Sequence, residues 1–173
     1  APSSAQELAQ MMHDATSLVD AGPIAIRYPR GAARQVGEHE VGSGLSARKV
    51  LDGSGTCIIA VGKMLETAEK AAAILAANGL DVTVWDPRCC APLDPEMIAD
   101  AASHDRVITI EDGIRDGGIG MAIADAVCSI DQSTHVEVLG LPTKFIPHDP
   151  KSDAILSRFG LDVDSIVALA RAN

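Results

Sequence analysis

The chain has 173 residues, of which 47% are hydrophobic, 22% charged and 2% aromatic, as in a globular protein with an aliphatic core. A net charge of -10 disfavours nucleic-acid binding, which requires clustered Lys and Arg side chains. No apolar run approaches the roughly 20 residues of a membrane-spanning helix, and the first residues lack the pattern of a signal peptide. We therefore expect a cytoplasmic protein that binds neither nucleic acid nor membranes.

The first third of the chain has a mixed pattern. Residues 6–18 carry apolar side chains near helical spacing, and Ser4 is available as an N-cap, which predicts a helix. A turn at 20–23 leads to residues 24–28, whose branched and aromatic content predicts a short strand. Residues 32–55 contain five glycines and isolated apolar residues, so we expect a crossing between domains. The pattern there does not decide whether residues 41–51 add a strand.

The remainder alternates regularly between strands and helices. This order implies right-handed crossovers and a mostly parallel sheet covered on both faces, a three-layer α/β/α fold. Asn78-Gly79 should end the first helix, while Asp94 and Asp162 should cap two later ones. The predicted strands are 56–61, 82–85, 107–110 and 136–139, and the predicted helices are 64–77, 95–102, 117–127, 152–159 and 163–172.

Ligands of open α/β sheets bind beyond the carboxyl ends of the strands, so functional residues are expected at these positions. No nucleophile is paired with a base there, and we predict no catalytic residue. Glu111 and Asp112 would point to opposite sides of a strand, which disfavours a metal site. The glycines of residues 117–120 open a helix, where close packing is favoured over phosphate binding. Asp86, Arg88 and Asp94 are predicted to brace the turn at residues 89–92.

The cysteines and histidines give no sign of a metal site. Cys57, Cys89, Cys90 and Cys128 lack CxxC spacing, so we expect buried free thiols. The histidines are scattered without ligand spacing and are predicted to be surface or capping residues; they are His13, His39, His104, His135 and His148.

The strongest functional signal is Arg27-Tyr28-Pro29-Arg30-Gly31 at the end of a predicted strand. A guanidinium there can form a bidentate contact with a phosphate, and the neighbouring Pro and Gly restrain the backbone that carries it. Two arginines can equally serve as surface salt-bridge partners. The spacing alone leaves both readings open.

Several motifs together resemble the 1-deoxy-D-xylulose-5-phosphate synthases of the transketolase superfamily. Residues 22–31 are similar to the end of their pyrimidine-binding domain, and the Arg88 to Asp94 segment is similar to their Arg-x-x-x-Pro-Leu-Asp motif. Single motifs are shared with transketolases and with α-ketoacid dehydrogenase β subunits, but their joint order favours the synthase. Cys89-Cys90-Ala91 departs from the family, which usually carries larger apolar or basic residues there. The other matching segments are residues 110–120, 140–148 and 159–162.

The resemblance implies a thiamine-diphosphate- and Mg²⁺-dependent, homodimeric transferase that condenses pyruvate with glyceraldehyde 3-phosphate, with loss of CO₂, in non-mevalonate isoprenoid synthesis. Residues 1–34 would form the end of the pyrimidine-binding domain, and residues 56–173 would form the transketolase C-terminal domain. Residues 35–55 would be the linker between these two domains. Arg30 would bind the acceptor phosphate, with Arg27 a weaker second candidate.

The cofactor-holding segments and the N-terminal and pyrimidine-binding domains would lie outside this chain. We therefore expect the isolated chain to bind no cofactor and to be inactive. The alternatives are the C-terminal part of a transketolase or of an α-ketoacid dehydrogenase β subunit, or a non-catalytic scaffold domain.

Overall fold

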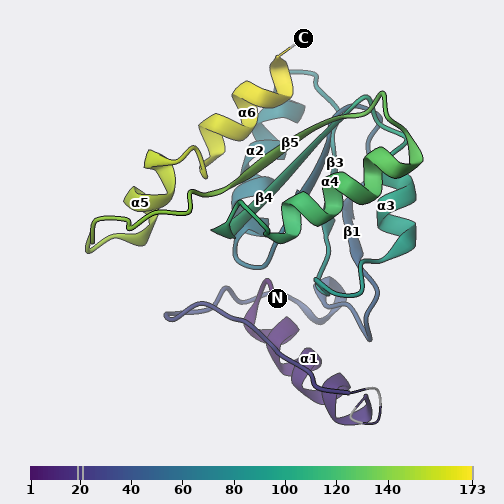
Figure 1. Ribbon diagram of the computed structural model, residues 1–173, viewed down its shortest axis with the longest axis vertical. Coiled ribbons are helices and arrows are strands. Elements are labelled where there is room, and N and C mark those ends of the chain that lie inside the picture. The colour runs from purple at the N-terminus through teal and green to yellow at the C-terminus, as the bar shows by residue number, and fades with distance from the viewer. Residues whose placement is uncertain (19, 21, 173) are drawn as a thin grey trace.

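The computed structural model describes residues 1–18, 20 and 22–172. An α/β domain forms the larger part of the molecule, and a smaller N-terminal part with one long helix lies beside it (Figure 1). No helix in the described ranges is long and apolar enough to cross a membrane. The predicted fold class, a three-layer domain with a mostly parallel sheet, is confirmed.

A five-stranded sheet in the order β1-β3-β2-β4-β5 organises the domain. Strands β2 to β5 are parallel, and β1 is an antiparallel edge strand beside β3. All four residues of β2 and of β3 are buried, because helices cover both faces of the sheet. The bounds are β1 Arg48–Leu51, β2 Cys57–Ala60, β3 Thr83–Asp86, β4 Arg106–Ile114 and β5 His135–Leu141.

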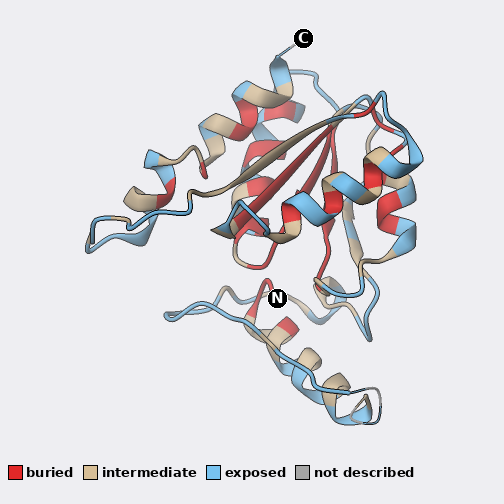
Figure 2. Ribbon diagram, in the orientation of Figure 1, coloured by how far each residue is buried: buried red, intermediate tan, exposed pale blue. Residues whose placement is uncertain are grey.

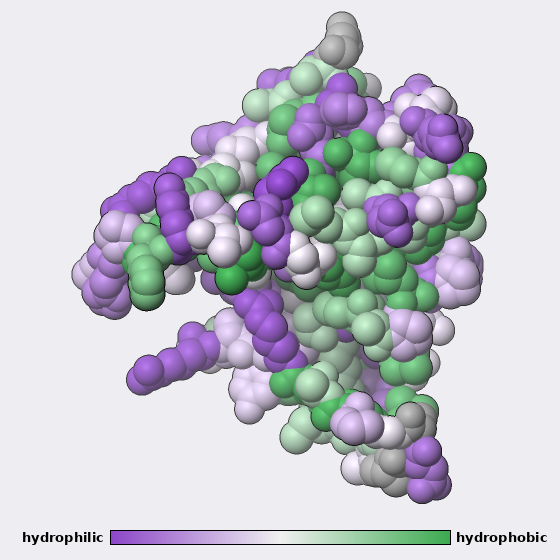
Figure 3. Space-filling view, in the orientation of Figure 1, coloured by the Kyte–Doolittle hydropathy of each residue, from purple (hydrophilic) through white to green (hydrophobic). Residues whose placement is uncertain are grey.

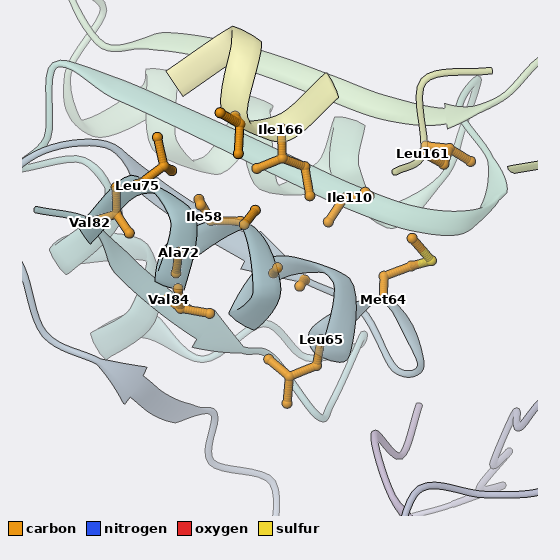
Figure 4. Packing of buried hydrophobic residues seen from close by; sticks show 14 of the residues in the cluster. Ile58, Met64, Leu65, Ala72, Leu75, Val82, Val84, Ile110, Leu161 and Ile166 are labelled. Atoms are coloured by element: carbon orange, nitrogen blue, oxygen red, sulfur yellow. The ribbon is translucent and has the colours of Figure 1, made fainter. Parts of the chain in front are cut away.

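Two apolar cores lie on opposite faces of this sheet. Helices α2 (Met64–Ala77) and α6 (Val163–Arg171) pack on one face, where Ile58, Leu75 and Ile166 meet (Figure 4). Helices α3 (Pro95–Ala101) and α4 (Ile119–Ile130) cover the other face. Helix α5 (Ser152–Arg158) adds Leu156 to the first core. Figure 2 shows the buried residues on the strands and on the inner sides of these helices.

The predicted helix caps are confirmed. The Asp94 side chain accepts a hydrogen bond from the Glu96 N–H, and that of Asp162 accepts from the Ser165 N–H. Gly79 adopts φ 75° after α2, a left-handed conformation that favours glycine.

The N-terminal part begins with α1 (Ala5–Ser17), whose N-cap Ser4 accepts a hydrogen bond from the Glu7 N–H at 3.0 Å, as predicted. The strand predicted at residues 24–28 is wrong. This segment has no regular secondary structure, no strand of the described residues pairs with it, and Ile24 and Tyr28 are 46% and 59% exposed. Extended residues need a neighbouring strand to satisfy their backbone groups.

The crossing at residues 35–55 contains a short 3₁₀ helix, η2 (Glu38–Glu40), and strand β1. Strand β1 joins the sheet of the α/β domain, so the strand that the sequence left undecided between residues 41 and 51 is present. The division of the chain into three segments stays a prediction.

Candidate functional site

A cavity of about 670 Å³ lies where the N-terminal part meets the carboxyl ends of β3 and β4. Its walls are mostly apolar, and the space-filling view shows hydrophobic side chains where the two parts meet (Figure 3). Position and composition match a ligand site of an open α/β sheet. The cavity is lined by residues from α1, from the 22–27 segment, from the turn at 88–92 and from the region of β4 and α4.

Arg88 joins the two parts of the molecule. Its side chain is 1% exposed, and its Nε donates to the Glu7 carboxylate on α1. Its Nη1 donates to the Ser43 and Ser46 carbonyls at 2.9 and 2.6 Å, and its Nη2 has no partner among the described residues. Because Glu7 also accepts from the Gly42 N–H at 3.0 Å, this buried pair ties α1, a loop and the end of β3 together.

The predicted brace at the 89–92 turn is present, with different partners. Asp86 accepts a hydrogen bond from the Arg88 N–H at 3.1 Å, as a turn brace requires. The ion pair of Arg88, however, is made with Glu7 and not with Asp86 or Asp94. Asp94 caps α3 and accepts from the Ala47 N–H at 2.7 Å instead. The sequence could not indicate this because Glu7 and Arg88 are 81 positions apart.

Asp86 is a buried carboxyl group beside this junction. Burial raises its pKa to about 6, although hydrogen bonds from the Ser3 hydroxyl and the Arg88 N–H oppose the shift. The Ser3 Oγ lies 2.6 Å from Asp86 Oδ2, which adds a second link between the N-terminal residues and β3. The group therefore titrates much closer to neutral pH than an ordinary aspartate.

The two predicted phosphate-binding arginines lie in different surroundings. Arg27 lines the cavity, and its Nη1 lies 2.9 Å from Asp112 Oδ1, with Lys63 Nζ 4.0 Å from the other oxygen. Arg30 is exposed and is not among the cavity-lining residues. No salt bridge of Arg30 is found within the described parts of the chain.

The two acidic residues of β4 engage different partners. Glu111 Oε1 accepts from the Gly120 N–H at 3.0 Å, whereas Asp112 pairs with Arg27. A Cβ added at Gly120 would lie 2.6 Å from Thr109 Oγ1, which confirms close packing as the role of this glycine. Glu111 also places negative charge at this helix start, where an anion would otherwise bind.

The described histidines and cysteines differ in burial. The buried His104 has its Nδ1 2.5 Å from the Gly55 carbonyl oxygen, and His148 is exposed. All four cysteines are free, but only Cys57 is buried, so the expectation of buried thiols is wrong for the other three. Cys89 and Cys90 line the cavity. In the described residues, no group of three or more His, Cys, Asp or Glu side chains could hold a metal ion.

Residues 46–166 match the family model for the transketolase C-terminal domain. The chain belongs to this family. A transketolase C-terminal domain accounts for the parallel sheet with helices on both faces and for the ordered sequence motifs. The recognised similarity to 1-deoxy-D-xylulose-5-phosphate synthases is also confirmed.

The synthase of Anaeromyxobacter sp. (strain K) is 40% identical over 181 aligned residues, which cover 99% of this chain and 28% of that protein. The synthase of Chlorobium luteolum is 38% identical over 96% of this chain and 27% of its own length. A solved structure of a split-gene transketolase, in an inactive β4 tetramer, covers 98% of this chain and 55% of its own with 26% identity and a TM-score of 0.86. The chain thus spans just over a quarter of the synthases it matches.

Proposed function

We propose that this chain is the C-terminal part of a cytoplasmic, homodimeric 1-deoxy-D-xylulose-5-phosphate synthase. The intact enzyme would condense pyruvate with glyceraldehyde 3-phosphate on thiamine diphosphate and release CO₂. The observation that carries the proposal is identity with such synthases along nearly the whole chain, 40% over 99% of its residues. The ordered motifs that favour the synthase over its relatives support the same choice.

The carboxylates of this chain do not fit Mg²⁺ and a diphosphate. Glu111 and Asp112 are engaged by Gly120 and Arg27, and the described residues bring no third ligand to them. Mg²⁺ requires several oxygen ligands around one point. We therefore assign cofactor binding to the remainder of the synthase. No step of the cofactor chemistry is assigned to residues of this chain. The isolated chain should be inactive.

The proposed contribution of this chain to substrate binding is an arginine for the acceptor phosphate. Arg30 is exposed and has no carboxylate partner among the described residues, so its guanidinium is available to an anion. Arg27 lines the cavity but shares its charge with Asp112, which makes it the weaker candidate. A charge-assisted contact of this kind contributes about 1.5–3 kcal/mol, enough to orient an acceptor.

The test is Arg30→Ala in the intact synthase. Because only the acceptor carries a phosphate, we expect the KM for glyceraldehyde 3-phosphate to rise at least about tenfold, the factor equivalent to roughly 1.4 kcal/mol. The KM for pyruvate and the decarboxylation of pyruvate should change little. Arg171→Ala, which removes an exposed arginine near the end of α6, is the matched control. An unchanged acceptor KM would remove Arg30 from the site.

A second candidate is a subunit of a split-gene transketolase, because the solved structure of such a protein covers 98% of this chain. Product analysis separates the two activities. A synthase releases CO₂ from pyruvate, whereas a transketolase transfers a two-carbon unit between sugar phosphates without loss of CO₂. Pyruvate-dependent CO₂ release by the intact protein therefore supports the synthase, and its absence supports the transketolase.

A further inference from the structure

Two adjacent cysteines are among the residues that line the apolar cavity. Cys89 and Cys90 follow Arg88 directly, both are half-buried, and both line the cavity. No hydrogen bond of either thiol group is found in the described part of the molecule. A ligand bound by either thiol would therefore displace no hydrogen bond of the described residues.

Adjacent cysteines are poorly suited to a direct disulfide. Consecutive Cα atoms lie about 3.8 Å apart across a trans peptide, whereas disulfide-linked residues usually have Cα atoms about 4.4–6.8 Å apart. Closing a direct S–S bond would strain the peptide between them and make the bond easily reduced. An atom that bridges the two sulfurs enlarges the ring that a direct S–S bond would close, and so relieves the strain in the peptide. The pair therefore favours a sulfur-binding atom that bridges both thiols.

We propose that Cys89 and Cys90 form a vicinal dithiol site that captures trivalent arsenic carrying one aromatic substituent. In the reaction with an aryl arsenic(III) oxide, two S–H bonds and the arsenic–oxygen bonding are broken and two As–S bonds form. The oxygen leaves with both thiol protons as one water. Arsenic remains trivalent and neither sulfur is oxidised, so no oxidant or reductant is required.

The surroundings favour this ligand over a metal ion. A structural zinc site takes four ligands, and the described residues offer no group of three His, Cys, Asp or Glu. An aryl arsenic(III) centre needs only two sulfurs because carbon occupies its third valence. Its aryl group can enter the apolar cavity, where Leu45, Pro92 and Ile119 form part of the lining.

Charge also favours an arsenic ligand over a metal ion at this site. Burial raises the pKa of the Cys90 thiol, so the neutral form is favoured there. The arsenic adduct is neutral, and its burial in an apolar cavity carries no charge penalty. A thiolate–metal complex would bring charge into the same place.

The experiment uses the reduced 173-residue chain and one equivalent of phenylarsine oxide, with intact mass spectrometry as the readout. We expect one adduct whose added mass equals the reagent minus one water. Chelation by two sulfurs should resist a large excess of glutathione and yield to dithiothreitol. Cys89→Ala and Cys90→Ala should each lose the glutathione-resistant adduct, whereas Cys128→Ala, which removes a half-buried thiol on α4, should keep it.

Circular dichroism identifies a variant that fails to fold, in which case Cys89→Ser and Cys90→Ser replace the alanine variants. A glutathione-resistant adduct that survives loss of either thiol of the pair would overturn the site. So would an adduct that disappears with Cys128.

The contribution of the cavity is tested with the phenyl and methyl reagents. We expect the folded chain to prefer phenyl over methyl about tenfold more than the urea-unfolded chain does, which corresponds to roughly 60 Å² of additional apolar surface removed from water. Leu45→Ser should reduce this preference and leave methyl binding unchanged. Equal preferences in folded and unfolded chains would show that adjacency of the thiols acts alone and would overturn the role of the cavity.

Discussion

At the scale of single residues, Asp86 is a buried carboxyl group displaced from its ordinary chemistry. It ends a strand whose four residues are all buried, and burial raises its pKa to about 6 from the ordinary value of 3.8. Ser3 and the Arg88 N–H donate to it, but two hydrogen bonds do not replace the water that a carboxylate loses. At neutral pH the folded protein therefore contains an ionised carboxylate that costs stability.

The sign of the pH dependence follows from this shift. Between pH 6 and 4 the folded state binds a proton at Asp86 and the unfolded state does not, so the contribution of this group to stability rises as pH falls. We expect the free energy of unfolding of the wild type to gain about 1 kcal/mol between pH 7 and 5 relative to Asp86→Asn. Urea unfolding of both proteins at several pH values measures this difference.

Asp131 provides a control of opposite sign. Hydrogen bonds from Ser133 lower the pKa of its carboxyl group, so any stability that it adds is lost on acidification. The difference in the free energy of unfolding between Asp131→Asn and the wild type should therefore be smallest at low pH. If Asp86→Asn and the wild type showed the same pH dependence from 7 to 5, Asp86 would not be the titrating group.

At the scale of elements, the docking of α1 depends on few contacts. Glu7 is fully buried and accepts from Arg88 Nε and from the Gly42 N–H, whereas the apolar side chains of α1 are at best half-buried. Loss of one partner from a buried ion pair costs about 3–5 kcal/mol because the other charge stays desolvated. This single pair therefore accounts for much of the attachment of α1 to the α/β domain.

Glu7→Ala should accordingly release α1. We expect hydrogen exchange of the α1 backbone amides to accelerate by at least about a hundredfold, the factor equivalent to roughly 3 kcal/mol, while the amides of β2 keep their protection. Glu66→Ala, which breaks an exposed i,i+4 pair with Lys70 on α2, should change exchange by a factor of about two at most. Unchanged protection of α1 in Glu7→Ala would show that apolar contacts hold the helix.

Local signals in the sequence are sufficient to predict most helices and strands. They are insufficient to predict contacts between residues that are distant in the sequence. The Asp94 and Asp162 caps and the glycine stop after α2 follow from a few neighbouring residues, and the structure contains all of them. The strand expected at residues 24–28 failed because a strand depends on a partner that local composition does not reveal.

The site could be predicted only in part for the same reason. The carboxyl ends of β3 and β4 are a site that topology alone indicates, and the cavity lies there. The partner of Arg88 and the enclosure of Cys89 and Cys90 depend on α1 and residues 22–27, which join the cavity only through the tertiary structure. Motif spacing carries no information about such contacts.

At the scale of the whole molecule, both apolar cores belong to the α/β domain. Every residue of the two buried clusters, and every side chain packed against them, lies at position 47 or later. The match to the transketolase C-terminal domain begins at residue 46. The N-terminal 45 residues instead add polar links, of which Glu7 to Arg88 and Ser3 to Asp86 are buried. The domain should therefore fold without them.

We expect a chain of residues 46–173 to unfold cooperatively in urea with a circular dichroism spectrum characteristic of the α/β domain. Trp85, the single tryptophan, packs in the core shared by α3 and α4 and should keep its buried emission. Residues 1–45 alone should show no cooperative transition, because none of the described residues among them belongs to a buried apolar cluster. Loss of cooperative unfolding in the 46–173 chain would mean that the buried polar links are required for the fold. In that case the α/β domain would not fold independently of residues 1–45.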